Sequence, residues 1–149
     1  MDLTEALPSL LPKAVAWAES QSAAALASGA PLRETDLALA RAAGVRRADR
    51  VRVRVVDTIP APQDAQLREA AAQTGLLGPD TIGLVLGYAV FLREGYETSP
   101  RVLSHELRHV YQYECYGSIK AFLSVYLPQI VQFGYADAPL ELDAAAHEQ

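Results

Sequence analysis

The chain has 149 residues, half of them hydrophobic, so it can bury one core of substantial size but is too short for a second domain. Its net charge of -5 and pI near 5.1 argue against nucleic acid or an anionic membrane as a partner, because binding phosphates requires clustered Lys and Arg. The sequence shows no transmembrane segment and no secretory signal, which predicts a cytoplasmic protein. The single cysteine, Cys115, excludes an intrachain disulfide and is expected to pack as a small apolar residue.

The N-terminal half predicts three helices and one strand. An Ala-rich amphipathic pattern indicates a helix over residues 8–28, which we expect to pack in the core rather than on a membrane surface. A second helix is predicted over residues 35–43 and a third over residues 64–74. Between residues 50 and 56, Arg and Val alternate with a period of two, which predicts a half-buried strand with a solvated basic face rather than a polyanion site.

The C-terminal half predicts a strand region followed by three helices. Residues 81–93 read as one bent strand or two short strands. A helix is expected over residues 100–116, and another over residues 118–131 with an interruption at Pro128. A last helix begins at Pro139, because proline is favoured in the first helical turn.

This order of elements predicts an α+β fold in which a small mixed or antiparallel sheet packs against several helices. One domain is expected to cover residues 1–149. Within it, residues 1–75 hold the N-terminal helices and the first strand, and residues 81–149 hold the remaining strand region and the C-terminal helices. The segment from Tyr88 to Arg93 is expected to be an edge strand, to which an extended peptide could add by backbone hydrogen bonds.

The segment from His105 to His109 reads HExxH and lies in the predicted helix over residues 100–116. Positions i and i+4 share one face of a helix, so both imidazoles can reach one metal ion, and Glu106 can act as the base toward an attacking water. A short motif can also arise by chance, and a single histidine usually has a structural role. Two of the three histidines in the chain nevertheless fall within this motif, which favours metal binding.

A catalytic zinc site usually takes three protein ligands, so a third ligand must come from elsewhere. The extended motif HExxHxxGxxH is absent, because Gln112 stands at the position of its Gly and neither Cys115, at the position of its last His, nor the following Tyr116 is a histidine. Glu141, in the first turn of the last predicted helix, is the candidate, although a glutamate there is also favoured by the helix dipole alone. Asp143 and His147 form a competing i, i+4 pair, but His147 lies close to the chain end, where chains fray.

Several segments together resemble the small gluzincin-type metallopeptidase domains, which pair HExxH with a later ExxA(D) helix. The resemblance spans roughly residues 81–148 and rests most on the HExxH motif and the PLELDA segment. The segments that carry it are residues 83–92, 104–114, 122–126, 134–135 and 139–144.

The resemblance implies that His105, His109 and Glu141 hold a zinc ion and that Glu106 is the general base. Ala145 stands where this family often has an aspartate, so any role of that aspartate beside the metal ligands is missing or moved. A zincin-like fold is implied as well.

The predicted function is therefore a zinc-dependent hydrolase that cleaves peptide bonds in a peptide or protein substrate. Hydrolysis also needs a donor that stabilises the oxyanion, and four tyrosines are candidates. A zincin-like binding module with weak or no activity is the alternative, because of the small size and Ala145. A peptide deformylase is disfavoured, because no cysteine precedes the motif in the required place. The oxyanion candidates are Tyr113, Tyr116, Tyr126 and Tyr135.

Overall fold

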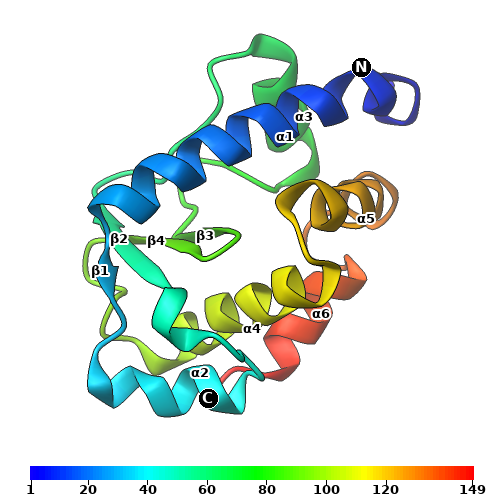
Figure 1. Ribbon diagram of the computed structural model, residues 1–149. Helices are drawn as coiled ribbons and strands as arrows, with labels where there is room; N and C mark the ends of the chain where they lie inside the picture. The colour runs from blue at the N-terminus through cyan, green and yellow to red at the C-terminus, as the bar shows by residue number, and fades with distance from the viewer.

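A four-stranded mixed sheet lies at the centre of the fold, and the computed structural model describes all 149 residues (Figure 1). The strands are β1 (Ala30–Pro31), β2 (Arg52–Val56), β3 (Gly83–Leu86) and β4 (Ala89–Arg93), in the order β1-β2-β4-β3. Strands β2 and β4 are parallel, and the other two pairs are antiparallel. With six helices around this sheet, the chain forms a single α+β domain, which confirms the predicted fold class.

The strand region before the motif forms a hairpin with its turn at Gly87, whose φ of 68° is left-handed. Strand β4 pairs with β2 on one side and with β3 on the other, so the prediction of an edge strand from Tyr88 to Arg93 is wrong. Four successive apolar residues of β4, from Ala89 to Leu92, are buried, as expected for a strand covered on both faces. The edge beside the motif helix is β3.

Helix α1 (Leu3–Ser28) is the longest element and runs across one side of the sheet (Figure 1). It begins before the predicted residue 8 because the side chain of Asp2 caps it by accepting a hydrogen bond from the backbone N–H of Glu5. Helix α2 (Leu37–Ala42) and helix α3 (Ala65–Thr74) are close to their predicted positions. Short 3-10 turns cover Glu34–Asp36 and Ala48–Arg50.

Helix α4 (Pro100–Tyr116) has the predicted boundaries, because the Ser99 hydroxyl accepts from the N–H of Val102 and Gly117 ends the helix in the left-handed region. Cys115 lies on the exposed face of its last turn, so the expectation that it packs inside is wrong.

Two further helices complete the fold. Helix α5 (Ile119–Phe133) passes through Pro128 without the predicted interruption, and helix α6 (Pro139–Ala146) begins where expected. Helices α1 and α5 pack against each other, and α6 packs against α4. None of the helices is both long enough and apolar enough to cross a membrane.

The basic strand β2 is only partly covered. Val51, just before it, is fully buried, but Val55 is 44% exposed, so the alternation predicts the strand better than it predicts which valines are buried. Arg50, which ends the 3-10 turn before the strand, and Arg54 of the strand both have intramolecular partners. The guanidinium of Arg50 lies 4.6 Å above the ring of Tyr88, and Arg54 donates to the hydroxyl of Ser28.

Candidate metal centre and adjoining cavity

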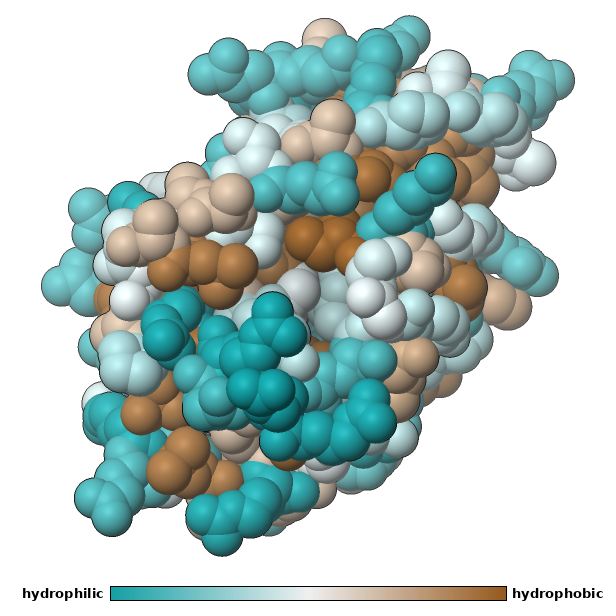
Figure 2. Space-filling model, viewed as in Figure 1, coloured by the Kyte–Doolittle hydropathy of each residue, from teal (hydrophilic) through white to brown (hydrophobic).

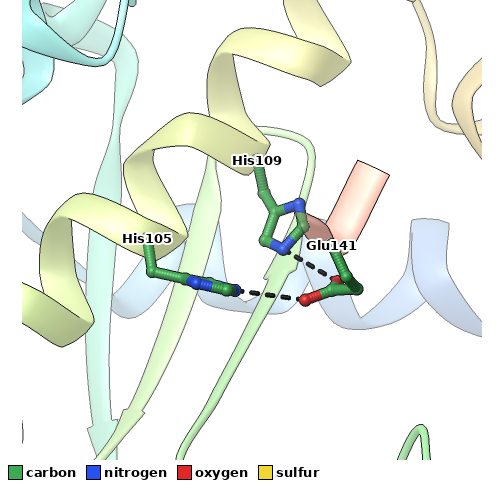
Figure 3. Close-up of side chains that lie close together, drawn as sticks. All are labelled: His105, His109 and Glu141. Carbon is green, nitrogen blue, oxygen red and sulfur yellow. Dashed lines mark hydrogen bonds and ion pairs between the residues drawn. The ribbon is translucent and has the colours of Figure 1, made fainter. Parts of the chain in front are cut away.

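Two histidines of α4 and one glutamate of α6 meet at one point (Figure 3). The Nε2 atom of His105 lies 3.1 Å from Oε1 of Glu141, and Nε2 of His109 lies 2.9 Å from Oε2 of the same carboxylate. One ligand atom from each residue lies within 4.8 Å of the other two. The structure thus brings together the three side chains that the sequence predicts as metal ligands.

The donor set suits zinc, which takes imidazole nitrogens and carboxylate oxygens and leaves one position open in catalytic sites. Zinc–ligand bonds of about 2.0 to 2.2 Å at tetrahedral angles separate neighbouring ligand atoms by roughly 3.3 to 3.6 Å. The separations of 3.1 Å and 2.9 Å between the histidine nitrogens and Glu141 are slightly shorter. A widening of roughly 0.2 to 0.7 Å would therefore seat a zinc ion among these three residues.

Gln112 determines which nitrogen of His109 faces the site. The Gln112 amide nitrogen donates to the Leu140 carbonyl and to Oδ2 of Asp143, both at 2.9 Å. Its Oε1 is therefore the acceptor that lies 2.8 Å from Nδ1 of His109. Because Nδ1 donates to Gln112, Nε2 is the nitrogen that faces the site. A charged His109 donates from Nε2 to Glu141, and a neutral ring would offer the Nε2 lone pair to a metal ion, as metal-binding histidines do.

Glu148 has the same role for His105. Its Oε2 lies 2.8 Å from Nδ1 of His105, and a carboxylate can only accept, so His105 also presents Nε2 to the site. The backbone N–H of Gln149 donates to the Ser104 hydroxyl at 2.9 Å, which ties this segment to α4. Sequence reasoning missed Glu148. The available signal was that Ala145 stands where the domains that the sequence resembles often have an aspartate, and that Glu148 is the next acidic residue along the chain.

The competing pair of Asp143 and His147 has other partners. Asp143 accepts from Nε and Nη2 of Arg108 at 2.8 Å and 3.2 Å, and these hydrogen bonds lower its pKa. Nδ1 of His147 lies 2.8 Å from the backbone carbonyl of Asp143. Asp143 therefore supports Gln112 from behind instead of facing the ligands.

Opposite charges hold the three candidate ligands together. Burial alone would raise the pKa of Glu141, but hydrogen bonds from His105 and His109 hold it far below the usual range. Burial likewise disfavours a charged His105, yet its hydrogen bond to Glu141 and the nearby Glu106 charge raise its pKa to about 9. Without metal, the site is a set of ion pairs in which protons occupy the place that a cation would take.

Glu106 turns away from this cluster and toward the sheet. It is only 6% exposed, and burial raises the pKa of its carboxyl group. Gly83, the first residue of β3, makes room for it, because a Cβ at this position would lie 2.7 Å from Oε1 of Glu106. Burial and the charges of His109, His105 and Glu141 determine the environment of this carboxylate, and it forms part of a cavity wall.

The four candidate tyrosines lie in different places. Tyr126 donates to Oε2 of Glu141 at 2.6 Å and so orients a ligand, whereas Tyr113 donates to the Val85 carbonyl inside the core. Tyr116 is 38% exposed and does not line the cavity. Tyr135 lines the cavity, and burial together with the charges of Glu141 and Glu106 raises its pKa above the usual value. Of the four, Tyr135 is best placed to donate toward a bound substrate.

An apolar cavity of about 130 Å³ adjoins the site on the Glu106 side. Of its 27 lining residues, 21 are hydrophobic, including Trp17 of α1, Leu67 of α3 and Leu127 of α5. Figure 2 shows apolar side chains around a hollow near the centre of one face of the molecule, with polar side chains gathered below it. The polar end of the cavity is formed by Glu106, His109, Tyr126, Tyr135 and Glu141.

Comparison of the chain with protein-family models, curated proteins and solved structures gave no match.

Proposed function

We propose that the protein is a zinc-dependent hydrolase that cleaves peptide bonds, with His105, His109 and Glu141 as the metal ligands. The observation that carries this proposal is the orientation of both histidines. Gln112 and Glu148 hold their Nδ1 atoms, which leaves both Nε2 atoms directed at one buried carboxylate. If the two histidines had only a structural role in the core, their Nε2 atoms would not need to be directed at the same point.

Glu106 is the proposed general base. A zinc ion held by the three ligands would supply Lewis-acid activation of a water and of the substrate carbonyl. The Glu106 carboxylate lines the cavity beside His109 and Glu141, so it can take a proton from the attacking water and pass it to the leaving nitrogen. Burial raises its pKa, which brings the carboxylate closer to the basicity that proton transfer near neutral pH requires.

A peptide is the proposed substrate for two reasons. The sequence resembles gluzincin-type peptidase domains, and strand β3 offers a sheet edge that begins at Gly83 beside Glu106. An extended chain could pair with the start of this edge. Further along β3, the carbonyls of Val85 and Leu86 already accept from Tyr113 and Ser22, so only the first part of the edge is open.

The test combines zinc binding with cleavage of a peptide library. Wild type should bind one zinc ion per chain and cleave peptides, and Glu106→Gln should bind zinc equally but lose at least about a hundredfold in turnover. Glu69→Gln, which changes an exposed residue of α3, is the matched control and should keep both properties. Zinc bound by Glu141→Ala as tightly as by wild type would refute the ligand assignment. Zinc binding without cleavage in wild type would favour the binding module instead.

A further inference from the structure

The cavity beside Glu106 is larger than hydrolysis alone requires. Glu106 and His109 of α4 and Glu141 of α6 lie at its polar end. Much of the remaining wall comes from α1, α3 and α5, whose contributions include Leu10, Leu67 and Ile130, and strand β3 also lines the cavity. Leu10 and Ile130 are nearly fully buried even though they border the cavity, so these helices enclose a space that opens onto the site.

We propose that this cavity binds the aromatic or large aliphatic side chain of the substrate residue next to the scissile bond, and so makes the protein selective for peptides with such a residue. The inference rests on the proposed function, because it assigns the substrate class of the same site. It adds a specificity pocket to which the N-terminal helices α1 and α3 contribute, and for which the HExxH motif gives no indication.

The size of the cavity supports a single side chain. An apolar cavity of about 150 Å³ in another protein stays dry and binds benzene. The space here, about 130 Å³, is therefore close to that needed by one aromatic ring or one branched aliphatic group. It is too small for a long acyl chain or for a folded peptide segment.

The chemistry of the wall excludes charged side chains. No Lys, Arg or Asp lines the cavity, so a substrate carboxylate would be buried without a partner. The carboxylates in the wall belong to Glu106 and Glu141. A positively charged substrate side chain would form ion pairs with Glu106 and Glu141. These carboxylates would then be unavailable as the base and as a metal ligand in the proposed reaction.

The position of the cavity supports a residue at the scissile bond. Glu106 belongs both to the catalytic cluster and to the cavity wall. A side chain in the cavity is joined through its own Cα to the neighbouring backbone, so its peptide groups must lie at the polar end. Filling the cavity would therefore orient the peptide bond toward Glu106 and help to exclude water from the base.

A peptide panel tests the selectivity. In otherwise identical peptides, the variable residue is Phe, Leu, Ala, Asp or Lys, and kcat/KM is measured for the zinc-loaded protein. We expect Phe and Leu to exceed Ala by about tenfold or more, and Asp and Lys to be cleaved more slowly than Ala. Equal rates for all five, or a preference for a charged residue, would overturn the inference while leaving peptide hydrolysis intact.

A filling variant tests whether this cavity is the origin of the selectivity. Ala14→Leu adds volume at a residue of α1 that lines the cavity, and Ala16→Leu makes the same change at an exposed residue of that helix. Ala14→Leu should lower kcat/KM for the Phe peptide by about tenfold and change the Ala peptide little. Ala16→Leu should change neither. Equal losses for both peptides in Ala14→Leu would contradict the proposal.

A binding measurement separates this inference from the proposed function. The metal-free Glu106→Gln protein is titrated with N-acetyl-phenylalaninamide and followed by NMR. Saturable shifts at cavity residues that disappear in Ala14→Leu would support the pocket even if no peptide were cleaved. An absence of binding in wild type and Glu106→Gln, or much tighter binding of dodecanoate, would refute the occupant proposed here.

Discussion

The two walls of the cavity differ in how they are stabilised. The wall from α4 and α6 consists of paired polar groups, in which His105, His109 and Glu141 contact one another directly. The opposite wall, from α1 and α3, consists of side chains such as Leu10 and Leu67. The hydrogen bonds and ion pairs of the polar wall form only in defined side-chain orientations. The apolar wall is stable with any set of buried side chains that fills the same volume.

This difference separates two kinds of effect. Substitutions in the apolar wall should change the free energy of unfolding and leave metal affinity nearly constant. In the polar wall, substitutions of Glu106 or Glu148 should change turnover or metal affinity at little cost to the fold, whereas loss of the buried pair of His105 and Glu141 should also lower stability. The predictions below test this separation, beginning with the largest expected effect.

Leu10→Ala should destabilise the protein by about 2 to 5 kcal/mol, because it removes a side chain that is only 4% exposed and enlarges an existing cavity. Zinc affinity should stay within about threefold of wild type. Urea denaturation and a competitive zinc titration measure the two quantities. Leu26→Ala, on the same helix but 41% exposed, is the control and should change stability far less. A parallel loss of zinc affinity in Leu10→Ala would show that the walls are not independent.

Raising the pH should destabilise the metal-free protein through His105. Despite burial, its contact with Glu141 and the nearby charges raise its pKa to about 9, compared with an ordinary value of 6.5. Because the folded pKa is the higher one, the charged ring stabilises the fold fully below about pH 6.5, and this contribution is lost as the pH rises through 9. At about 1.4 kcal/mol per pKa unit, the change is up to about 3 kcal/mol.

Denaturant unfolding in the presence of a chelator, at about pH 6 and about pH 10, measures this effect. Glu141→Gln removes the main partner of His105 and should flatten the profile. An unchanged slope in that variant would assign the pH dependence to other groups.

Gly83→Ala should lower turnover by about a hundredfold with little change in zinc affinity. The added methyl group would lie 2.7 Å from Oε1 of Glu106, and this flexible carboxylate can move away at small cost to the fold. A displacement of about 1 Å in a catalytic group costs on the order of a hundredfold in rate. Gly78→Ala is the control, because a methyl group there meets no atom within 4 Å. Equal turnover in the two variants would argue against Glu106 as the base.

Glu148→Ala should weaken zinc binding by about 10- to 100-fold, the usual cost of losing a group that orients a metal ligand. Glu148→Gln keeps an acceptor for Nδ1 of His105 and should recover most of the affinity. Arg101→Ala removes only the outer ion pair of Glu148, at 3.5 Å, and should change little. A competitive chelator titration compares all three, and equal affinity in Glu148→Ala and wild type would contradict this role.

The elements with local signals could be predicted from the sequence. Helix α4 is capped by Ser99 and ends at Gly117, and α6 begins at Pro139. These signals are local in the sequence, so the start of each helix, the end of α4 and the HExxH spacing could be predicted. The convergence of Glu141 with the two histidines follows from the motif only by resemblance. The structure shows that the three lie together.

Features that depend on distant parts of the chain could not be predicted in this way. The central place of β4 results from parallel pairing with β2, which lies over thirty residues earlier, and no local pattern encodes strand order. The contact between Glu148 and His105 joins residues 43 apart. The cavity arises where α1, α3 and α5 fail to fill the space between them, which depends on volumes from three separate segments.

The contact between His105 and Glu141 spans 36 positions of the chain and encloses the whole of α5. A zinc ion held at both ends would act as a cross-link that closes this loop in any state that retains the ligands. For a loop of this length, a permanent cross-link removes chain entropy worth about 3 to 4 kcal/mol from the unfolded ensemble. Zinc would therefore also protect the segment from α4 to α6 against proteolysis, and chelation would expose α5 to cleavage before the sheet.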